Sequence, residues 1–378
     1  MKINMCGSIL TIPYQLSKHL RKKGIEVKLF IDSLSEEKSY LPEWEDEDIE
    51  ENGLPNWIYK ERVSLYRYFG GFKEEREFLN CLSDCDLIHT HGEASIWGSF
   101  TKKPYVFQSY GFDLCYMPFL KGSLKQRILS SLMRRGIRKA SKILILPYQI
   151  PAIKRLGISY DRYSNLYCGI DTQKYKRADA SLGNELREKF KVDLILFSPT
   201  RHQWTNSEIT NKGNDSLIRA IHKFLKGTKQ KSLFIFVEKG SDVAKSKSLI
   251  DEMGIKDNIL WIEPVNKKKL IEYYSNSDIV LDQFVEPGEL GQITLEAMSV
   301  GVPTFIYLTN PKGYFEESPP VVNVSTTDEI ASEMLRFADN PELRIEVGNK
   351  SREWILKYRD WNIVVDKYIS LYKEILGF

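Results

Sequence analysis

Two basic residues follow an apolar, strand-like run in the middle of the chain. Arg201 comes just after the run Leu194–Ser198, and Lys212 stands before Gly213, where we expect a helix to begin. Open parallel α/β sheets bind ligands beyond the carboxyl ends of their strands, so both cations are expected at that edge. Together they would neutralise a diphosphate and stabilise the charge that develops as it departs. Taken singly, each is typical of an ordinary surface residue.

A glycine-rich segment is the second candidate for chemistry. The apolar run Ile279–Leu281 leads into a loop with Gly288 and Gly291, and this loop opens a helix that carries Glu296. A helix N-terminus offers free N–H groups and partial positive charge to a phosphate, and nearby carboxylates accept hydrogen bonds from sugar hydroxyls. The segment therefore indicates a site for a sugar and a phosphate. The alternative is that Glu289 caps the helix and Glu296 is a solvated helix residue.

The elements that must position these residues form two successive β/α arrays. Short apolar runs separated by helical or loop stretches are typical of buried parallel strands. The runs of the first array are Met1–Cys6, Val27–Ile31, Asp86–His91, Pro104–Gln108 and Ile143–Leu146. Those of the second are Leu194–Ser198, Leu233–Val237, Ile259–Ile262, Ile279–Leu281, Thr304–Tyr307 and Val321–Val324. The pattern predicts an α/β protein with two Rossmann-like domains.

Length and composition agree with that reading. The chain has 378 residues, enough for two domains, and is 42% hydrophobic and 28% charged, which excludes a disordered or fibrous protein. A net charge of +3 is too small to indicate a nucleic-acid partner. Five cysteines without a signal peptide favour the reducing cytoplasm, and Cys81 and Cys85 lack a second pair of ligands for zinc.

The first array lacks most of the pattern of a dinucleotide site. Such a site needs three spaced glycines after the first strand, and here Gly7 stands alone, although Asp32 lies at a suitable distance. A nicotinamide-dependent oxidoreductase is therefore disfavoured.

Charge is unevenly distributed along the chain. Residues 36–51 are dominated by acid and predict a solvated loop; a metal site at Asp46 and Asp48 is disfavoured, because a cation needs convergent ligands. Residues 114–160 contain no acid but many Lys and Arg side chains with apolar residues between them. This basic window suits an anionic membrane surface, and equally a helix that packs by its apolar side and exposes ordinary cations.

In these features the chain resembles the retaining glycosyltransferases of family 4, which have the two-Rossmann-domain fold called GT-B. The resemblance covers nearly the whole chain. It rests on the segments Asp86-Leu-Ile-His-Thr-His-Gly92, Ser109-Tyr-Gly-Phe-Asp-Leu114, Tyr167-Cys-Gly-Ile-Asp171, Leu295-Glu-Ala-Met298 and Gly301-Val-Pro303, and on Arg201 and Lys212-Gly213. It implies an acceptor domain over residues 1–178, a donor domain over residues 179–355 and a terminal helix, residues 356–378, that crosses back to the first domain.

The resemblance also implies roles for individual residues. Catalytic roles fall to Arg201, Lys212, His91 and Tyr110, and His89 is expected on the opposite face of its strand with a structural role. Donor-binding roles fall to Gly7, Glu238, Pro264, Val265, Gly288, Glu289, Leu290, Gly291, Gln292 and Glu296. No metal or cofactor is expected.

Three departures from the family pattern concern these positions. A Glu is usual eight residues before the second Glu, and here Gly288 occupies that place. A His is usual where Tyr110 stands, and an Asn where Cys168 stands. The pair Asp282-Gln283 replaces the usual Pro-Ser, which suggests a subgroup that lacks the first Glu.

We therefore expect a retaining glycosyltransferase that moves a hexosyl group from a nucleotide-diphosphate sugar to a glycan or lipid-linked acceptor. It would work in the cytoplasm, in solution or at the inner face of the cell membrane. The alternatives are a GT-B sugar-nucleotide epimerase or phosphorylase, and a non-catalytic sugar-nucleotide-binding homologue.

Overall fold

The structure is a computed structural model that describes residues 1–378 except 10, 34–39, 62–71, 166–167, 206–210 and 310–314. The chain forms two compact units, Met1–Gly169 with Trp361–Phe378, and Ile170–Asp360. The chain therefore passes from one unit to the other at residues 169/170 and 360/361, whereas the sequence suggested boundaries at 178/179 and 355/356. The reason lies in Ile170 and Tyr175, which are fully buried in the core of the second unit.

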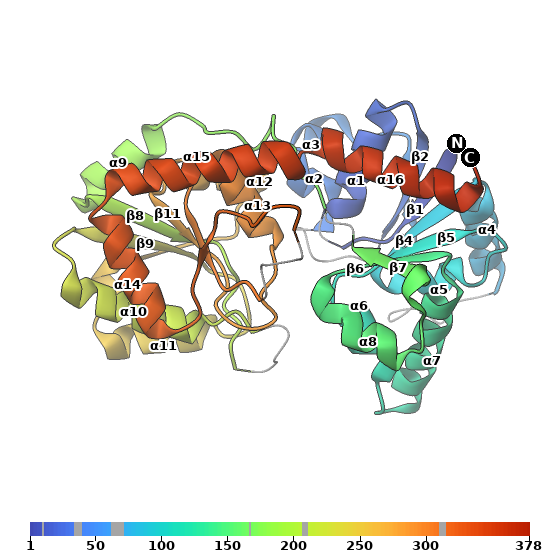
Figure 1. Ribbon diagram of the computed structural model, residues 1–378, viewed down its shortest axis with the longest axis horizontal. Coiled ribbons are helices and arrows are strands. Elements are labelled where there is room, and N and C mark those ends of the chain that lie inside the picture. Colours follow the sequence, from blue (N-terminus) through green and yellow to red (C-terminus); the bar gives the residue numbers. More distant parts are fainter. Residues whose placement is uncertain (10, 34–39, 62–71, 166–167, 206–210, 310–314) are drawn as a thin grey trace. The chain divides into compact units, whose positions relative to one another are not determined.

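The first unit contains a parallel sheet of seven strands in the order β3-β2-β1-β4-β5-β6-β7 (Figure 1). Its strands are β1 (Lys2–Cys6), β2 (Glu26–Asp32), β3 (Ile58–Glu61), β4 (Leu87–His91), β5 (Tyr105–Gln108), β6 (Lys142–Ile145) and β7 (Tyr163–Asn165). Its helices are α1 (Ile12–Lys22), α2 (Pro42–Glu45), α3 (Asp48–Asn52), α4 (Phe72–Ser83), α5 (Ser95–Gly98), α6 (Phe112–Cys115), α7 (Leu124–Lys139), α8 (Ile150–Arg155) and α16 (Trp361–Leu376).

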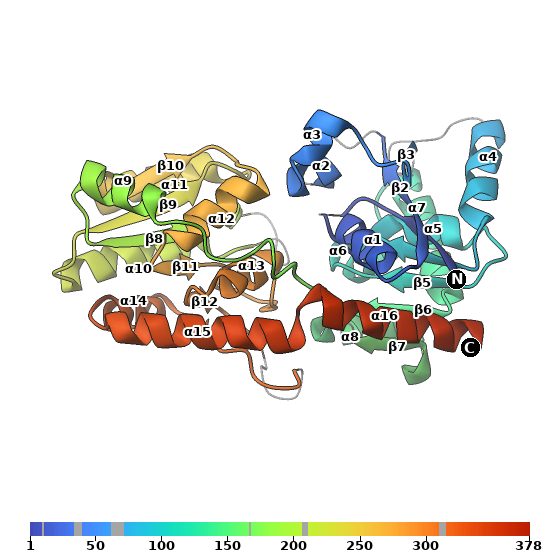
Figure 2. The ribbon, with the colours of Figure 1, turned by 90° about the horizontal axis from the view of Figure 1, so that it is seen from above.

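Helices cover both faces of this sheet because its strands are apolar on both sides. Leu87 faces the layer formed by α1 and α16, and its neighbour Ile88 faces the layer formed by α4, α5 and α7. Figure 2 shows α16 beside α1, and the indole N–H of Trp361 donates to Gln15 Oε1 at 2.9 Å. The apolar stripe of the terminal segment, including Tyr372, is buried here.

The second unit contains a parallel sheet of six strands in the order β10-β9-β8-β11-β12-β13. Its strands are β8 (Leu194–Ser198), β9 (Ser232–Val237), β10 (Ile259–Ile262), β11 (Ile279–Leu281), β12 (Thr304–Ile306) and β13 (Val322–Asn323). Its helices are α9 (Ser181–Phe190), α10 (Asn214–Gly227), α11 (Val243–Met253), α12 (Lys267–Ser275), α13 (Gln292–Val300), α14 (Thr327–Ala338) and α15 (Pro341–Tyr358). From β8 the chain builds toward β10 and then returns to add β11 on the other side of β8. Ligands bind at such a reversal of strand order.

The acidic segment is not the solvated loop that its composition suggested. Its described part forms α2 and α3, and Glu45 is only 4% exposed. Glu45 accepts a hydrogen bond from Thr11 Oγ1 at 2.8 Å, and Asp46 accepts one from the Tyr14 hydroxyl at 2.6 Å and pairs with Lys18 at 2.6 Å. The prediction was wrong for these carboxylates because donors on α1 and at the residue before it satisfy them.

Candidate functional site

The two cations singled out in the sequence lie together at the reversal point of the second sheet. Arg201 follows β8, and its Nε donates to Gln203 Oε1 at 2.9 Å. The backbone N–H of Lys212 donates to the carbonyl of Gln203 at 2.8 Å, so Gln203 contacts both cationic residues. The Lys212 ammonium donates to the side-chain oxygen of Gln283, just beyond β11.

Burial and charge both act on Lys212. Burial lowers its pKa to about 8, an effect that the carboxylate of Asp282 opposes and the positive charge of Arg201 reinforces. The ammonium is thus mostly charged at neutral pH and loses its proton in mildly alkaline solution. An arriving diphosphate would favour the charged form.

The pair Asp282-Gln283 links this loop to the glycine-rich segment. Asp282 accepts hydrogen bonds from Thr200 Oγ1 at 3.1 Å and from Thr294 Oγ1, in the first turn of α13, at 2.6 Å. Gln283 Nε2 donates to the carbonyls of Pro287 and Glu289 at 3.3 and 3.4 Å. The sequence showed this pair only as a departure from a family pattern, and its contacts depend on tertiary structure.

Gly288 lies where no side chain fits. A Cβ atom there would stand 2.4 Å from the carbonyl oxygen of Tyr307 and 2.7 Å from the amide nitrogen of Thr309. Gly288 and Thr309 also exchange hydrogen bonds, from Gly288 N to Thr309 Oγ1 at 3.1 Å and from Thr309 N to the Gly288 carbonyl at 3.0 Å. The absence of an acid at position 288 is therefore part of how this loop packs.

Replacing Gly288 by Ala or Glu is expected to lower the free energy of unfolding by about 1–3 kcal/mol, because the backbone at Tyr307 and Thr309 must move. Thermal unfolding of the full chain measures this effect. Gly291→Ser is the matched control in the same loop: its nearest Cβ contact is 3.8 Å away, and Ser suits the position before a helix. Equal midpoints for Gly288→Ala and Gly291→Ser would contradict the prediction.

Glu296 is fully buried on α13, which excludes a solvated role for it. One carboxylate oxygen forms an ion pair with the ammonium of Lys267, the first residue of α12, and the other accepts a hydrogen bond from the Tyr274 hydroxyl at 3.0 Å. Burial and this carboxylate raise the pKa of Tyr274 well above its usual value, so Tyr274 acts as a donor. A polyhydroxylated ligand at Glu296 would have to share it with Lys267.

The remaining expected donor residues lie at the ends of β9 and β10 and at the start of α13. Glu238, after β9, pairs with Lys247 at 2.6 Å, while Pro264 is exposed and Val265 half-buried after β10. Leu290 packs against the core of the second unit, Gly291 precedes α13 and Glu289 is half-buried. Gln292 Nε2 is buried without a hydrogen-bond partner in the described structure.

His202 is a neighbour of this region that the sequence reading missed. It is fully buried one residue after Arg201, and its ring lies 4.7 Å from that of Trp261. A Cβ at Gly240 would stand 2.3 Å from the His202 carbonyl oxygen, so the loops after β8 and β9 are closely packed. The sequence did offer a signal for His202, since a histidine stands shortly after the strand β8, next to Arg201.

In the first unit, Gly7, His91 and Tyr110 lie together at the carboxyl edge of the sheet. A Cβ at Gly7, whose φ is +125°, would stand 2.6 Å from the His91 carbonyl oxygen. His91 Nδ1 lies 2.7 Å from the Tyr110 hydroxyl. Burial, and to a smaller extent the nearby His89 ring, hold the pKa of His91 well below 6.5. His91 is therefore neutral and serves as a hydrogen-bonding group.

His89 does not lie on the opposite face of β4 from His91. The two rings stack with centroids 4.4 Å apart, and His89 Nδ1 lies 2.6 Å from the Tyr372 hydroxyl on α16. The prediction was wrong because residues two apart on a strand share a face.

A buried carboxylate fixes the turn that carries Tyr110. Asp113 accepts hydrogen bonds from Ser109 Oγ at 2.8 Å, Gly111 N at 2.9 Å and Leu114 N at 3.0 Å. Burial raises its pKa to about 6 in spite of these donors. Tyr110 is thus held by a turn whose hydrogen bonds are local.

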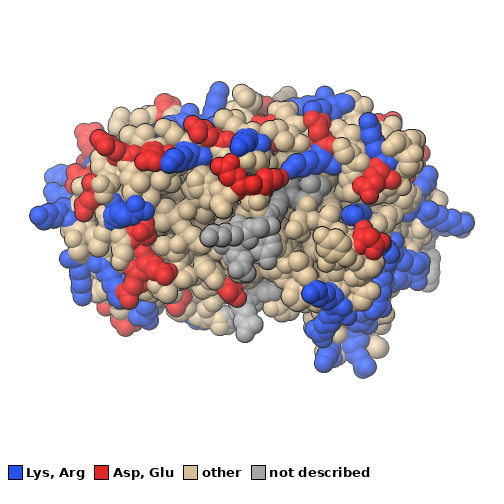
Figure 3. All heavy atoms as spheres, in the orientation of Figure 1, with Lys and Arg blue, Asp and Glu red and all other residues tan. Residues whose placement is uncertain are grey.

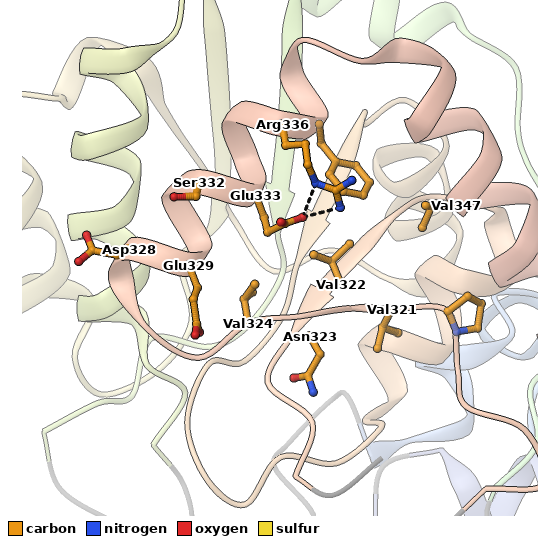
Figure 4. A pocket seen from close by; sticks show the side chains of 12 residues that line it. Val321, Val322, Asn323, Val324, Asp328, Glu329, Ser332, Glu333, Arg336 and Val347 are labelled. Carbon is orange, nitrogen blue, oxygen red and sulfur yellow. Dashed lines mark hydrogen bonds and ion pairs between the residues drawn. The ribbon is translucent and has the colours of Figure 1, made fainter. Parts of the chain in front are cut away.

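We also searched the described residues for a metal site and for a hollow in the surface. Among the described residues, no three His, Cys, Asp or Glu side chains gather in a way that could hold a metal ion. A surface hollow of about 690 Å³ lies between residues 320–324 and α14, and none of the expected site residues lines it (Figure 4).

Comparison with known proteins matches the two halves of the chain to two family models. Residues 11–174 match glycosyltransferase family 4, and residues 208–354 match glycosyl transferases group 1. The chain belongs to these glycosyltransferase families. An uncharacterized glycosyltransferase of Methanocaldococcus jannaschii is 23% identical over 224 residues, which is 56% of this chain and 53% of that protein. The match thus spans about half the length of that relative.

Solved structures share the GT-B fold of this glycosyltransferase family member. Sucrose-phosphate synthase of Thermosynechococcus elongatus is similar over 100% of both chains, with a TM-score of 0.71 and 14% identity. HepE of Anabaena, solved with UDP and with UDP-glucose, is similar over 99% of this chain and 100% of its own, with a TM-score of 0.73 and 14% identity. The expected fold class, α/β of the GT-B type with two Rossmann-like units, is confirmed.

Proposed function

We propose that the protein transfers a hexosyl group from a nucleotide-diphosphate sugar to a glycan or lipid-linked acceptor, with retention at the anomeric carbon. The observation that carries the proposal is the convergence of Arg201 and Lys212 where the strand order of the second sheet reverses. In a family of glycosyl transfer enzymes, two cations there suit the diphosphate of a donor. HepE, a structural relative, binds UDP and UDP-glucose.

In the proposed reaction Arg201 and Lys212 bind the diphosphate and stabilise the negative charge that it gains as the sugar leaves. The first turn of α13 offers backbone N–H groups to the same donor, and the Glu296 carboxylate would accept a hydrogen bond from a hydroxyl while sharing its charge with Lys267. Neutral His91 and Tyr110 offer hydrogen bonds to an acceptor that reaches the first unit. Product configuration, read by NMR of the anomeric proton, tests retention.

Binding of a donor is expected to stabilise the protein. A thermal-shift panel of UDP-, GDP-, ADP- and TDP-sugars should give a raised unfolding temperature with the matching donor, since ligand at 100 times its Kd adds about 2.7 kcal/mol. The same donor should then be hydrolysed slowly to free nucleoside diphosphate without acceptor. Stabilisation without any release of nucleoside diphosphate would indicate a binding protein and contradict the proposed transfer.

As part of this proposal, the basic window of residues 114–160 binds an anionic membrane surface, where a lipid-linked acceptor would be reached. Leu124 and Ile128, one turn apart on α7, are 74% and 40% exposed, whereas Leu129 and Met133 of the same helix are buried. The same window carries eight exposed cations: Lys121, Lys125, Arg127, Arg135, Arg138, Lys139, Lys154 and Arg155. Figure 3 shows Lys and Arg gathered over the part of this unit where Figure 1 has α7. No described helix has the length and apolar character needed to span a bilayer.

We expect the protein to sediment with phosphatidylglycerol vesicles and not with phosphatidylcholine vesicles, because each cation near an anionic surface contributes about 1 kcal/mol. The variant Leu124→Ser/Ile128→Ser with Lys125→Gln and Arg127→Gln should lose this binding. Lys226→Gln and Lys229→Gln in the second unit provide the charge-matched control. Binding that persists in the α7 variant would contradict a role for this helix.

A further inference from the structure

Two buried polar side chains stand just beyond β11. On one side they contact Thr200 and Lys212, and on the other the loop of residues 287–291 that precedes α13, here called the donor loop. Asp282 is 5% exposed and Gln283 is 8% exposed. Burying a polar side chain costs free energy unless it is hydrogen-bonded, so the hydrogen-bond partners of these two residues show what the side chains hold in place. The proposed function uses neither of them.

The amide of Gln283 makes contacts in two directions. Its oxygen accepts a hydrogen bond from the ammonium of Lys212, and its Nε2 donates to the carbonyls of Pro287 and Glu289. An amide has an acceptor on one side and two donors on the other, which is what this place requires. One side chain therefore ties the cation to the loop that precedes α13.

The backbone around Gln283 is itself fixed. The N–H of Tyr307 donates to the Gln283 carbonyl at 2.8 Å, and the N–H of Phe284 donates to the Lys212 carbonyl at 3.2 Å. Asp282 holds Thr200, one residue before Arg201, and Thr294 of α13. The two cations and the donor loop are thus parts of one hydrogen-bonded arrangement.

The chemistry of an amide at this place differs from that of an acid. A carboxylate would neutralise Lys212 and leave less positive charge for a phosphate, whereas the neutral amide orients the ammonium and preserves its charge. A carboxylate would also face the carbonyls of Pro287 and Glu289 without a proton to donate. The side chain at 283 also fixes this loop where Gly288 leaves no room for an acid.

We infer that Gln283 is a positioning residue for donor binding, holding the Lys212 ammonium toward the diphosphate and the turn at residues 287–289 in its binding arrangement. This inference rests on the proposed function. In this chain, which has Gly288 where the family usually has Glu, Asp282 and Gln283 hold the donor loop through hydrogen bonds.

The test compares wild type with Gln283→Glu and Gln283→Met in calorimetric titrations with UDP, GDP, ADP and TDP from pH 6.5 to 9.5. Wild-type affinity for its nucleotide should fall as pH rises through about 8, because the cation that binds phosphate loses its proton. In Gln283→Glu the added negative charge should move this fall to higher pH and weaken binding at pH 7 about tenfold. Gln283→Met, which lacks the acceptor, should weaken binding at pH 7 and move the fall to lower pH.

Lys212→Met is the reference, since it should remove the alkaline fall altogether. Gln283→Glu and Gln283→Met have similar side-chain volumes, so either one can be used for the test if the other fails to fold. Wild-type affinity and an unchanged alkaline fall in both Gln283 variants would overturn the inference while leaving the proposed function intact. A wild type that binds none of the four nucleotides would overturn the proposed function, and the inference with it.

Discussion

Removing either cation at the second sheet, by Arg201→Ala or Lys212→Met, is expected to slow release of nucleoside diphosphate from the donor by a factor on the order of 10² to 10³. This is the typical loss when one preorganised charge or donor at a developing anion is removed. The effect should fall mainly on the rate at saturating donor, because charge on the diphosphate grows as the bond to the sugar breaks. Lys212 is the sharper case, since it is partly buried and held by Gln283.

The measurement is the steady-state rate of nucleoside diphosphate release with the donor selected by the thermal-shift panel. Lys226→Met, at an exposed position near the end of α10, is the control and should keep the wild-type rate. Transfer at the wild-type rate by Arg201→Ala or Lys212→Met would contradict their assignment to the leaving group. Loss of rate with an unchanged unfolding midpoint would separate chemistry from folding.

The two sheets could be predicted from the sequence because parallel strands buried on both faces appear as continuous apolar runs. The run Leu233–Val237, for example, became β9, and Leu194–Ser198 became β8 with the same bounds. Once the strands are predicted, polar residues that directly follow a strand, such as Arg201, can be placed at the carboxyl edge of the sheet. Short strands with mixed residues, such as β3 and β7, lacked this signal.

What could not be predicted depends on contacts between distant segments. Glu45 appeared to be a solvated acid because nothing in its neighbourhood in the sequence indicates that α1 supplies its donors. Gly288 appeared to be a loss, and only the backbone at Tyr307 and Thr309 shows that a side chain cannot be placed there. The role of Gln283 likewise appears only when Lys212 and the turn at 287–289 meet around it.

The ion pair between Lys267 and Glu296 is expected to have the largest effect on stability. The Lys267 side chain is 13% exposed and that of Glu296 is fully buried, so water cannot solvate the carboxylate when Lys267 is removed. Lys267→Met should lower the free energy of unfolding by about 3–5 kcal/mol, because it leaves an uncompensated carboxylate in the core of the second unit. Glu296→Gln should cost less, since it keeps the shape of the side chain and its contact with Tyr274.

Urea unfolding of the full chain measures these changes, and Lys269→Met on the same helix is the matched control. Lys269 pairs with Glu272 at an exposed position, where such pairs contribute about 0–1 kcal/mol. The double variant Lys267→Met/Glu296→Gln should be more stable than Lys267→Met alone, because the buried negative charge is then absent. If Lys267→Met were as mild as Lys269→Met, the pair would not be the buried contact described, and Glu296 would be free to bind a ligand without displacing Lys267.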